Sequence, residues 1–172
     1  MKGWTYVQRI RTGVDGKGVE LRVMFDNSAP RSLILYTAAA RAALVPVWGR
    51  ELVISPDSGE PEESMCKYAV PLVSWSGSKH WLKARGVTCT AYAEKKKVPR
   101  GAAALFPEME GEASKAHQVA GMVDLIIGKD QQKWQPRKVC DSQRAEDNLT
   151  LMKSEFPPRY IVRETRRAER KL

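Results

Sequence analysis

Residues 20–30 of the chain read ELRVMFDNSAP, and this stretch decides the fold. Leu21, Val23 and Phe25 recur at every second position, which is the period of a strand that buries one face. The strand runs into a polar turn that Pro30 closes. The stretch therefore predicts a half-buried strand that ends in a tight turn.

The same alternation of strands and turns extends in both directions along the chain. Upstream, residues 4–11 mix β-branched and aromatic residues with polar ones, and residues 14–18 contain an Asp-Gly hairpin signal. Further strands are expected at 33–35, 51–54, 67–73, 80–84, 87–92, 123–128 and 149–152.

Helical signals are few. Thr37 is expected to cap an alanine-rich helix that continues through Leu44 and stops before Pro46. Helix-like polar residues also occupy positions 129–135. Many short strands with one or two short helices predict a mostly-β closed barrel or sandwich.

Composition limits the classes to which the protein can belong. Of the 172 residues, 42% are hydrophobic and 28% charged, which is a globular balance. No apolar run approaches the ~20 residues of a membrane span, and the start of the chain, Met1–Trp4, lacks the apolar stretch of a secretory signal. We therefore expect a cytoplasmic protein that is not secreted and does not contact a membrane.

The cysteines and the charge add two further expectations. Cys66, Cys89 and Cys140 have no close spacing, so we expect no disulfide framework, no metal site and no cofactor. The net charge is +9, and the segment from Arg159 onward contains six basic residues against two acidic ones. Residues 1–156 are expected to form one domain and residues 157–172 a basic tail, either solvated or in weak contact with nucleic-acid phosphate.

Asp26 is the first candidate for chemistry, because it directly follows the strand and begins the turn. A carboxylate held on rigid backbone near a core can have its protonation tuned by burial and by neighbours. The alternative is an ordinary turn aspartate that bonds its own backbone. Leu125–Gly128, a later apolar strand that ends in glycine, is the second feature.

Together, these features resemble the retropepsin-like aspartic proteases, and most closely the protease domain of BEL/Pao-type retrotransposon polyproteins. The resemblance covers roughly residues 5 to 162. The matching pieces are residues 23–29, 32–34, 68–72, 123–130 and 148–154.

The resemblance implies an aspartic endopeptidase that cuts extended peptides, most naturally its own polyprotein inside an intracellular particle. Such an enzyme needs two carboxylates that share one proton, one to activate water and one to donate to the peptide carbonyl. This chain has one aspartate turn, so the second carboxylate would be Asp26 of another protomer in a homodimer. Asp124 is an intramolecular alternative, although it falls within an apolar strand and not in a turn.

The turn departs from the family's usual Asp-Thr/Ser-Gly. Asn27 stands where a hydroxyl residue usually bridges the two protomers, and its amide can donate a bond as well. Ser28 stands where glycine lets the backbone pass close to the carboxylates, so its side chain is expected to loosen or block the site. Ala29 is expected to shape the turn. Replacing Ser28 by glycine is expected to restore or raise activity.

The resemblance also assigns two peripheral segments. The loop at residues 55–61 would be the flap that closes over substrate, with Asp57, Ser58 and Gly59 at its tip; the alternative is a surface hairpin. Residues 149–152 would form the strand that interleaves at the dimer interface, the alternative being the edge strand of a monomer.

Two other functions stay open. The first is a catalytically inactive binding or assembly module with the same fold. The second is a nucleic-acid-binding protein that uses the basic tail and the Lys95–Lys97 cluster. His80 and His117 are the only histidines, and no catalytic triad or metal-ligand spacing includes them.

Overall fold

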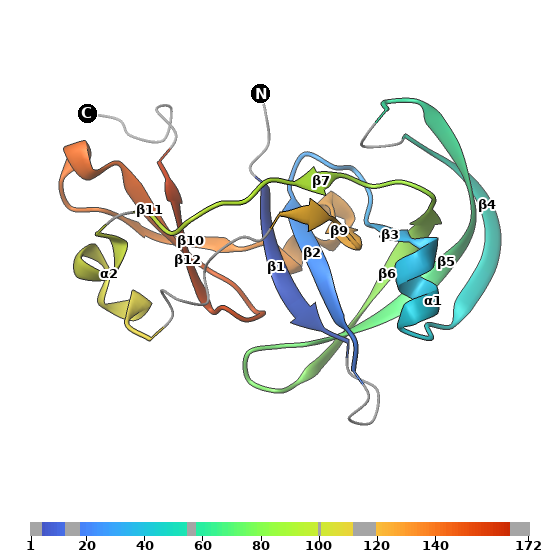
Figure 1. Cartoon of the computed structure of the whole chain (residues 1–172), viewed down its shortest axis with the longest axis horizontal. Coiled ribbons are helices and arrows are strands. Elements are labelled where there is room, and N and C mark those ends of the chain that lie inside the picture. The colour runs from blue at the N-terminus through green and yellow to red at the C-terminus, as the bar shows by residue number, and fades with distance from the viewer. Residues whose placement is uncertain (1–4, 13–17, 55–57, 100, 112–119, 166–172) are drawn as a thin grey trace.

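The structure is a computed structural model that describes residues 5–12, 18–54, 58–99, 101–111 and 120–165. Within these ranges the protein is mostly β, which confirms the coarse fold prediction. Its strands form a seven-stranded sheet, a three-stranded sheet and a two-stranded sheet (Figure 1).

The seven-stranded sheet contains, in spatial order, β1 (Thr5–Arg11), β2 (Glu20–Asp26), β9 (Leu125–Ile127), β3 (Leu33–Leu35), β6 (Lys79–Val87), β5 (Pro61–Val73) and β4 (Pro46–Ile54). The three-stranded sheet contains β10 (Arg137–Asp141), β11 (Leu149–Lys153) and β12 (Tyr160–Glu164). The two-stranded sheet pairs β7 (Tyr92–Ala93) with β8 (Gly121–Met122). The helical segments are α1 (Tyr36–Arg41), α2 (Ala102–Leu105) and the 3₁₀ turns η1 (Pro107–Met109), η2 (Lys129–Trp134) and η3 (Ala145–Asp147).

The position of β9 is the central feature of the large sheet. This strand lies between β2 and β3, parallel to β2 and antiparallel to β3. In the parallel pair, Val23 lies opposite Leu125 and Phe25 opposite Ile127. Because β9 has a neighbour on each side, its three residues are fully buried and uniformly apolar, as a central strand requires.

The expected closed barrel is wrong, because the large sheet is open. Its strand order runs from an edge at β1 to an edge at β4. The sheet is nevertheless strongly curled, since Thr12, just after β1, forms an antiparallel bridge with Leu72 of β5. A single bridge does not close a barrel, and β4 continues the sheet beyond β5 on the other side.

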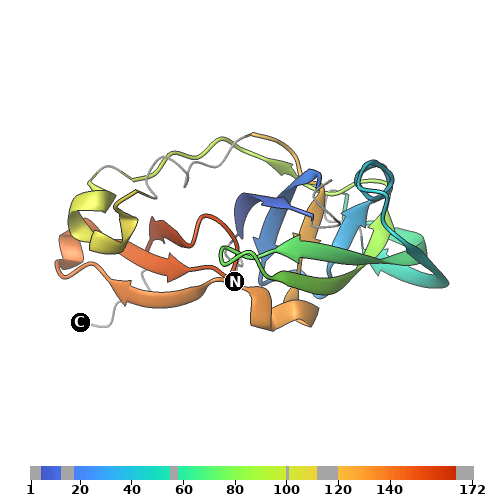
Figure 2. The same ribbon diagram turned by 90° about the horizontal axis from the view of Figure 1, so that it is seen from below.

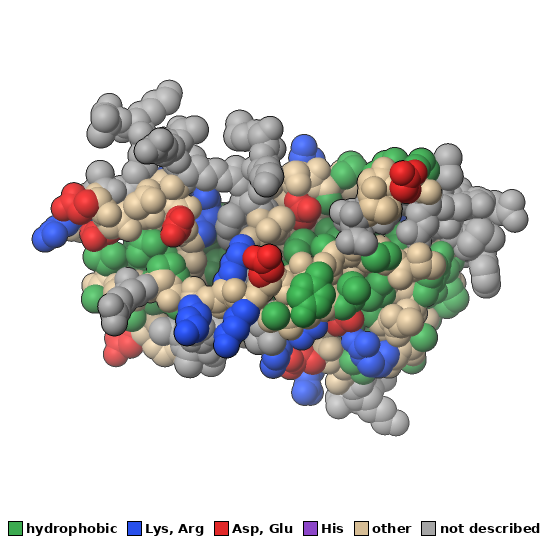
Figure 3. Space-filling model, turned by 45° about the horizontal axis from the view of Figure 1, so that its top comes forward, with side chains coloured by type: hydrophobic (Ala, Val, Ile, Leu, Met, Phe, Trp, Pro, Cys, Tyr) green, Lys and Arg blue, Asp and Glu red, His purple; other side chains and the backbone are tan. Residues whose placement is uncertain are grey.

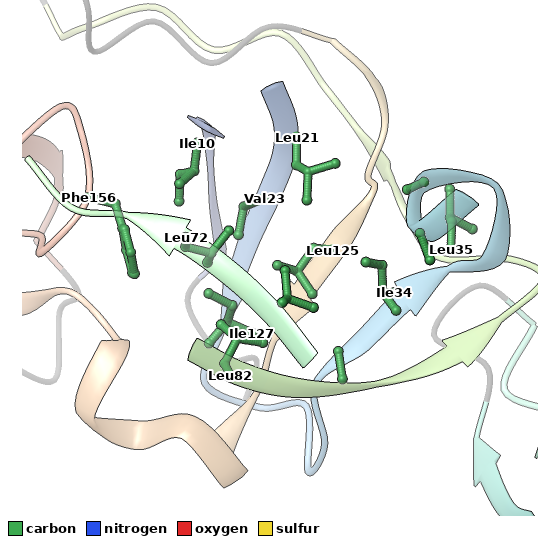
Figure 4. Packing of buried hydrophobic residues seen from close by; sticks show 14 of the residues in the cluster. Ile10, Leu21, Val23, Ile34, Leu35, Leu72, Leu82, Leu125, Ile127 and Phe156 are labelled. Carbon is green, nitrogen blue, oxygen red and sulfur yellow. The ribbon is translucent and has the colours of Figure 1, made fainter. Parts of the chain in front are cut away.

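The curl encloses the main hydrophobic core. Side chains from β1, β2, β5, β6 and β9 point toward one another inside it (Figure 4). Phe25 is fully buried and stacks on Phe156, with the ring centroids 6.1 Å apart. Full burial of one such side chain contributes about 2–3 kcal/mol.

The three-stranded sheet forms a second lobe beside β1, as Figures 1 and 2 show. Tyr6 of β1 packs with Met152 and Ile161 of this lobe. The Gln8 amide donates to the Pro158 carbonyl over 2.9 Å and accepts the Ser154 hydroxyl over 3.1 Å. Part of the segment expected to be a basic tail is therefore strand β12, paired with β11.

Three local predictions differ from the structure. Helix α1 begins at Tyr36 and has no side-chain cap, so Thr37 does not cap it. The helix ends at Arg41 because Ala43 takes a left-handed φ of 51°. The strand expected at residues 87–92 does not form, because β6 already extends through Val87 and only Tyr92 and Ala93 pair beyond it.

Candidate functional site

Asp26 is the last residue of β2, and its carboxylate is held by the turn that follows. The backbone N–H of Ser28 donates to Oδ1 of Asp26 over 2.9 Å, and the Ser28 hydroxyl donates to the same oxygen over 2.6 Å. The Ala29 N–H donates to the Asp26 carbonyl over 3.2 Å. The carboxylate is half-buried, so it is fixed in position but still open to solvent.

The two oxygens of this carboxylate differ. Oδ1 of Asp26 receives both donors from Ser28, whereas no hydrogen bond joins Oδ2 to any residue that the structure describes. An ionised carboxylate has about four lone-pair sites. The arrangement leaves one oxygen able to accept a proton from water or to share one with a second carboxylate.

The residues that follow β9 contact the backbone of the turn and hold it in place. The Lys129 N–H donates to the Ala29 carbonyl over 2.8 Å. Gly128 lies so close to the turn that a Cβ there would be 2.6 Å from the Ala29 oxygen and 2.7 Å from the Arg31 oxygen. Glycine is therefore required at position 128 for this close approach of two backbone segments.

Ser32 and Asp130 form a clamp that joins the segment after the turn to the segment after β9. The sequence analysis did not predict it. The Ser32 N–H and hydroxyl donate to the two carboxylate oxygens of Asp130, over 3.0 and 2.7 Å. The same hydroxyl accepts the Gly128 N–H over 3.1 Å. Ser32 is fully buried, so these bonds satisfy its N–H and hydroxyl groups, which have no access to water.

The structure excludes Asp124 as the intramolecular partner of Asp26. Asp124 N–H donates to the Arg22 carbonyl, and its carboxylate accepts the Arg22 N–H over 2.8 Å. Arg22 is four residues before Asp26 on the same strand, a separation of roughly 13 Å at 3.3 Å per residue. Two carboxylates that share a proton must be in hydrogen-bond contact, so these two do not form such a pair.

The other turn residues lie near the surface. Asn27 and Ala29 are half-buried, and Ser28 is exposed. The structure thus brings residues 26–29 together as one turn, supported by residues 128–130, although only the turn itself was predicted as a site.

The flap prediction falls partly outside the described residues, because Asp57 lies there. Ser58 and Gly59 are exposed, and the Ser58 hydroxyl accepts the Glu60 N–H over 3.2 Å. Gly59 has a φ of 71°, which suits a hairpin tip.

In Figure 1 the β4–β5 hairpin and the turn after β2 both lie toward the top of the molecule. Figure 3 brings that side forward and shows hydrophobic side chains gathered across the middle and right of the face.

The expected interface strand has no edge for a partner. β11 pairs with β10 on one side and with β12 on the other. Both of its rows of backbone hydrogen-bonding groups are therefore used within the chain. The prediction that residues 149–152 interleave with a second protomer is wrong for this reason, and so is the alternative of an edge strand.

Other kinds of site find little support in the described part of the chain. No group of three or more His, Cys, Asp or Glu side chains lies close enough there to hold a metal ion. His80 packs against Trp134, with ring centroids 4.5 Å apart. Among the described helices none has the length and apolar character needed to cross a membrane.

Comparisons with protein-family models, curated proteins and solved structures found no match to this chain.

Proposed function

We propose that the protein is a retropepsin-type aspartic endopeptidase whose active site combines Asp26 from two protomers. The observation that carries the proposal is the Asp26 turn. Its carboxylate is fixed through Oδ1 by Ser28 and open at Oδ2, at the end of a buried strand. The hydrogen bonds of Ser32 with Asp130 and Gly128 support the segment that follows the turn, which gives the rigidity that a catalytic carboxylate needs.

The chemistry follows from two carboxylates brought together. At a separation of about 3 Å both cannot ionise, so the pair keeps one proton. The ionised carboxylate takes a proton from water, which attacks the peptide carbonyl while the other carboxylic acid donates to the carbonyl oxygen. The substrate would be an extended polypeptide, most naturally the protein's own retrotransposon-type polyprotein in an intracellular particle.

A homodimer is part of the proposal, because Asp124 is too far away to complete the site. The two-fold axis would pass near Asp26, and the contacts would come from the surface around the turn, since β11 has no free edge. Sedimentation over a wide range of protein concentration tests this step. A strict monomer at the highest concentration that supports cleavage would contradict it.

The decisive experiment is a mixing assay of peptide cleavage. Asp26→Asn should abolish cleavage, whereas Glu155→Gln, which changes an exposed carboxylate between β11 and β12, should not change it. When wild type is pre-mixed with an equal amount of Asp26→Asn, roughly a quarter of all dimers should be active wild-type homodimers, as random pairing in a two-fold assembly requires. The mixture should therefore have about half the activity of its wild-type protein alone. Activity equal to that of the wild-type half alone would show that each protomer works by itself.

Cleavage should be fastest at acidic pH. The shared proton is lost as the pH rises, and the pair would then carry two repelling charges. The pH dependence of kcat/KM for one peptide measures this. A rate that increases steadily up to about pH 8 would be inconsistent with the paired-carboxylate mechanism.

A further inference from the structure

A concave site, separate from the Asp26 turn, lies near the other end of β2. Its volume is about 440 Å³, and its lining residues are Arg9, Glu20, Arg22, Arg41, Met122 and Asp124. The three arginines come from three different elements, β1, β2 and α1. They face two carboxylates, so the lining has an excess of one positive charge in a protein of net charge +9.

Arg22 is the most firmly placed of the three cations. Its Nη1 donates to the Met122 carbonyl over 3.1 Å, while its buried Nε has no hydrogen-bond partner. The guanidinium packs so tightly on Gly121 that a Cβ there would lie 2.1 Å from Nη1. A buried guanidinium N–H without an acceptor is uncommon, and an incoming anion at this site could reach the same side chain.

The other two arginines can change partners readily. Arg9 meets Glu20 at 3.5 Å, and both side chains are 55% exposed. Ion pairs this exposed are weak, so an anion can compete for Arg9. Arg41 contacts Asp124 at 3.1 Å, but its planar fork has five donors, more than one carboxylate can use.

An exposed aromatic residue lies one strand away from the site, on β7. Tyr92 pairs directly with Met122 across the β7–β8 ribbon. Directly paired residues point to the same face of a sheet, and Met122 lines the site. Tyr92 is 67% exposed and Met122 45% exposed, so both side chains of this cross-strand pair are accessible at the border of the site.

We propose that this site binds one nucleotide unit of a single-stranded nucleic acid. Arg9, Arg22 and Arg41 would contact the backbone phosphate, for which the guanidinium fork is well suited. The base would stack on Tyr92. Binding of single strands commonly combines such a basic groove with an aromatic platform, and needs no particular base sequence. The site is separate from Asp26, so binding does not require protease activity.

Fluorescence anisotropy with a labelled oligouridylate, measured on the full chain at several salt concentrations, tests the proposal. Arg9→Gln with Arg41→Gln should weaken binding about tenfold or more and lower the salt dependence by about two phosphate contacts. Tyr92→Ala should weaken it about tenfold and Tyr92→Phe hardly at all. Arg137→Gln, which removes one exposed arginine of β10, is the control that matches the charge change of Arg9→Gln alone. Asp26→Asn should bind like wild type.

Two further measurements keep the outcome clear. Circular dichroism shows whether each variant is folded. If the double variant does not fold, Arg9→Gln alone takes its place, because it removes only a weak surface ion pair. Photocrosslinking of an oligomer that contains bromouridine should label Tyr92. The proposal is overturned if the Arg9 and Tyr92 variants bind as tightly as wild type, or if crosslinks map only to the basic C-terminal segment. It is equally overturned if duplex or inorganic phosphate displaces the probe as well as an unlabelled single strand does.

Discussion

Ser28 donates two hydrogen bonds to one oxygen of Asp26, one from its backbone and one from its side chain, over 2.9 and 2.6 Å. Among described residues, only Ala43 and Asn148 combine a side chain with a positive φ. Ser28 therefore sits in a backbone conformation that accepts a Cβ. The serine stands where retropepsin-like proteases usually have glycine; it does not strain the turn, and it adds a donor.

This relationship changes the expected effect of substitutions at Ser28. We now expect Ser28→Ala and Ser28→Gly both to slow peptide turnover, because each removes one of the two donors to Oδ1. Unfolding in urea should show a loss of about 1 kcal/mol for either variant. If both variants are folded and faster than wild type, the serine obstructs the site, as its departure from the family pattern first indicated.

The clamp between Ser32 and Asp130 should contribute to stability as well as to the site. Ser32→Ala leaves the Gly128 N–H and the Asp130 carboxylate each without one partner, which should cost about 1–3 kcal/mol in the free energy of unfolding. Asp130→Asn keeps the shape but replaces one acceptor by a donor and should also destabilise. Urea unfolding of both single variants and the double variant gives the coupling energy. Strict additivity would mean that the two residues do not act together.

Gly128→Ala tests the close approach of the two backbone segments. The added Cβ would meet the Ala29 and Arg31 carbonyl oxygens at 2.6 and 2.7 Å, and neither backbone atom can move freely. We expect a loss of about 1–3 kcal/mol, as for other overpacked sites, together with a loss of cleavage. Gly77→Ala, in the connection between β5 and β6, is the control, because an added Cβ there has nothing within 4 Å, although its positive φ of 87° adds a cost of its own. Equal stability of Gly128→Ala and wild type would contradict the close contact.

Tyr6 should make the protein less stable at high pH. Burial raises the pKa of Tyr6 above its ordinary value of 10.0. Below about pH 10 the phenol is neutral in both states, and above it the unfolded chain ionises first. The free energy of unfolding should therefore fall as the pH rises above 10, while the folded state stays neutral. Tyr6→Phe should flatten this fall in urea titrations at pH 8, 10 and 11, and an unchanged slope would show that Tyr6 does not titrate on unfolding.

The strands that carry strong apolar patterns could be predicted from sequence. β2, β3 and β9 each have buried apolar residues bounded by turn signals, and they form close to the predicted places. β10 was missed because four of its five residues are exposed and show no alternation. β12 was missed because Arg163 and its charged neighbours give that segment the composition of a tail.

The supporting half of the candidate site could not be predicted for a different reason. Ser32 and Asp130 are 98 residues apart, and no local pattern links a buried serine to an exposed aspartate. Glycine at position 128 was noted only as part of a family pattern. Its physical role, the passage of backbone beside Ala29 and Arg31, depends on the insertion of β9 between β2 and β3.

The insertion of β9 also has a consequence for the order in which the chain folds. β5 and β6 pair through a short connection, so this hairpin can form early. Val23, in contrast, pairs with Leu125, 102 positions later. Contacts this distant in sequence form slowly, because a long loop must close first. On the ribosome the inner edges of β2 and β3 stay without a partner until β9 has emerged, and the Asp26 turn acquires its support only then. The proposed active site is therefore among the last parts of the sheet to form.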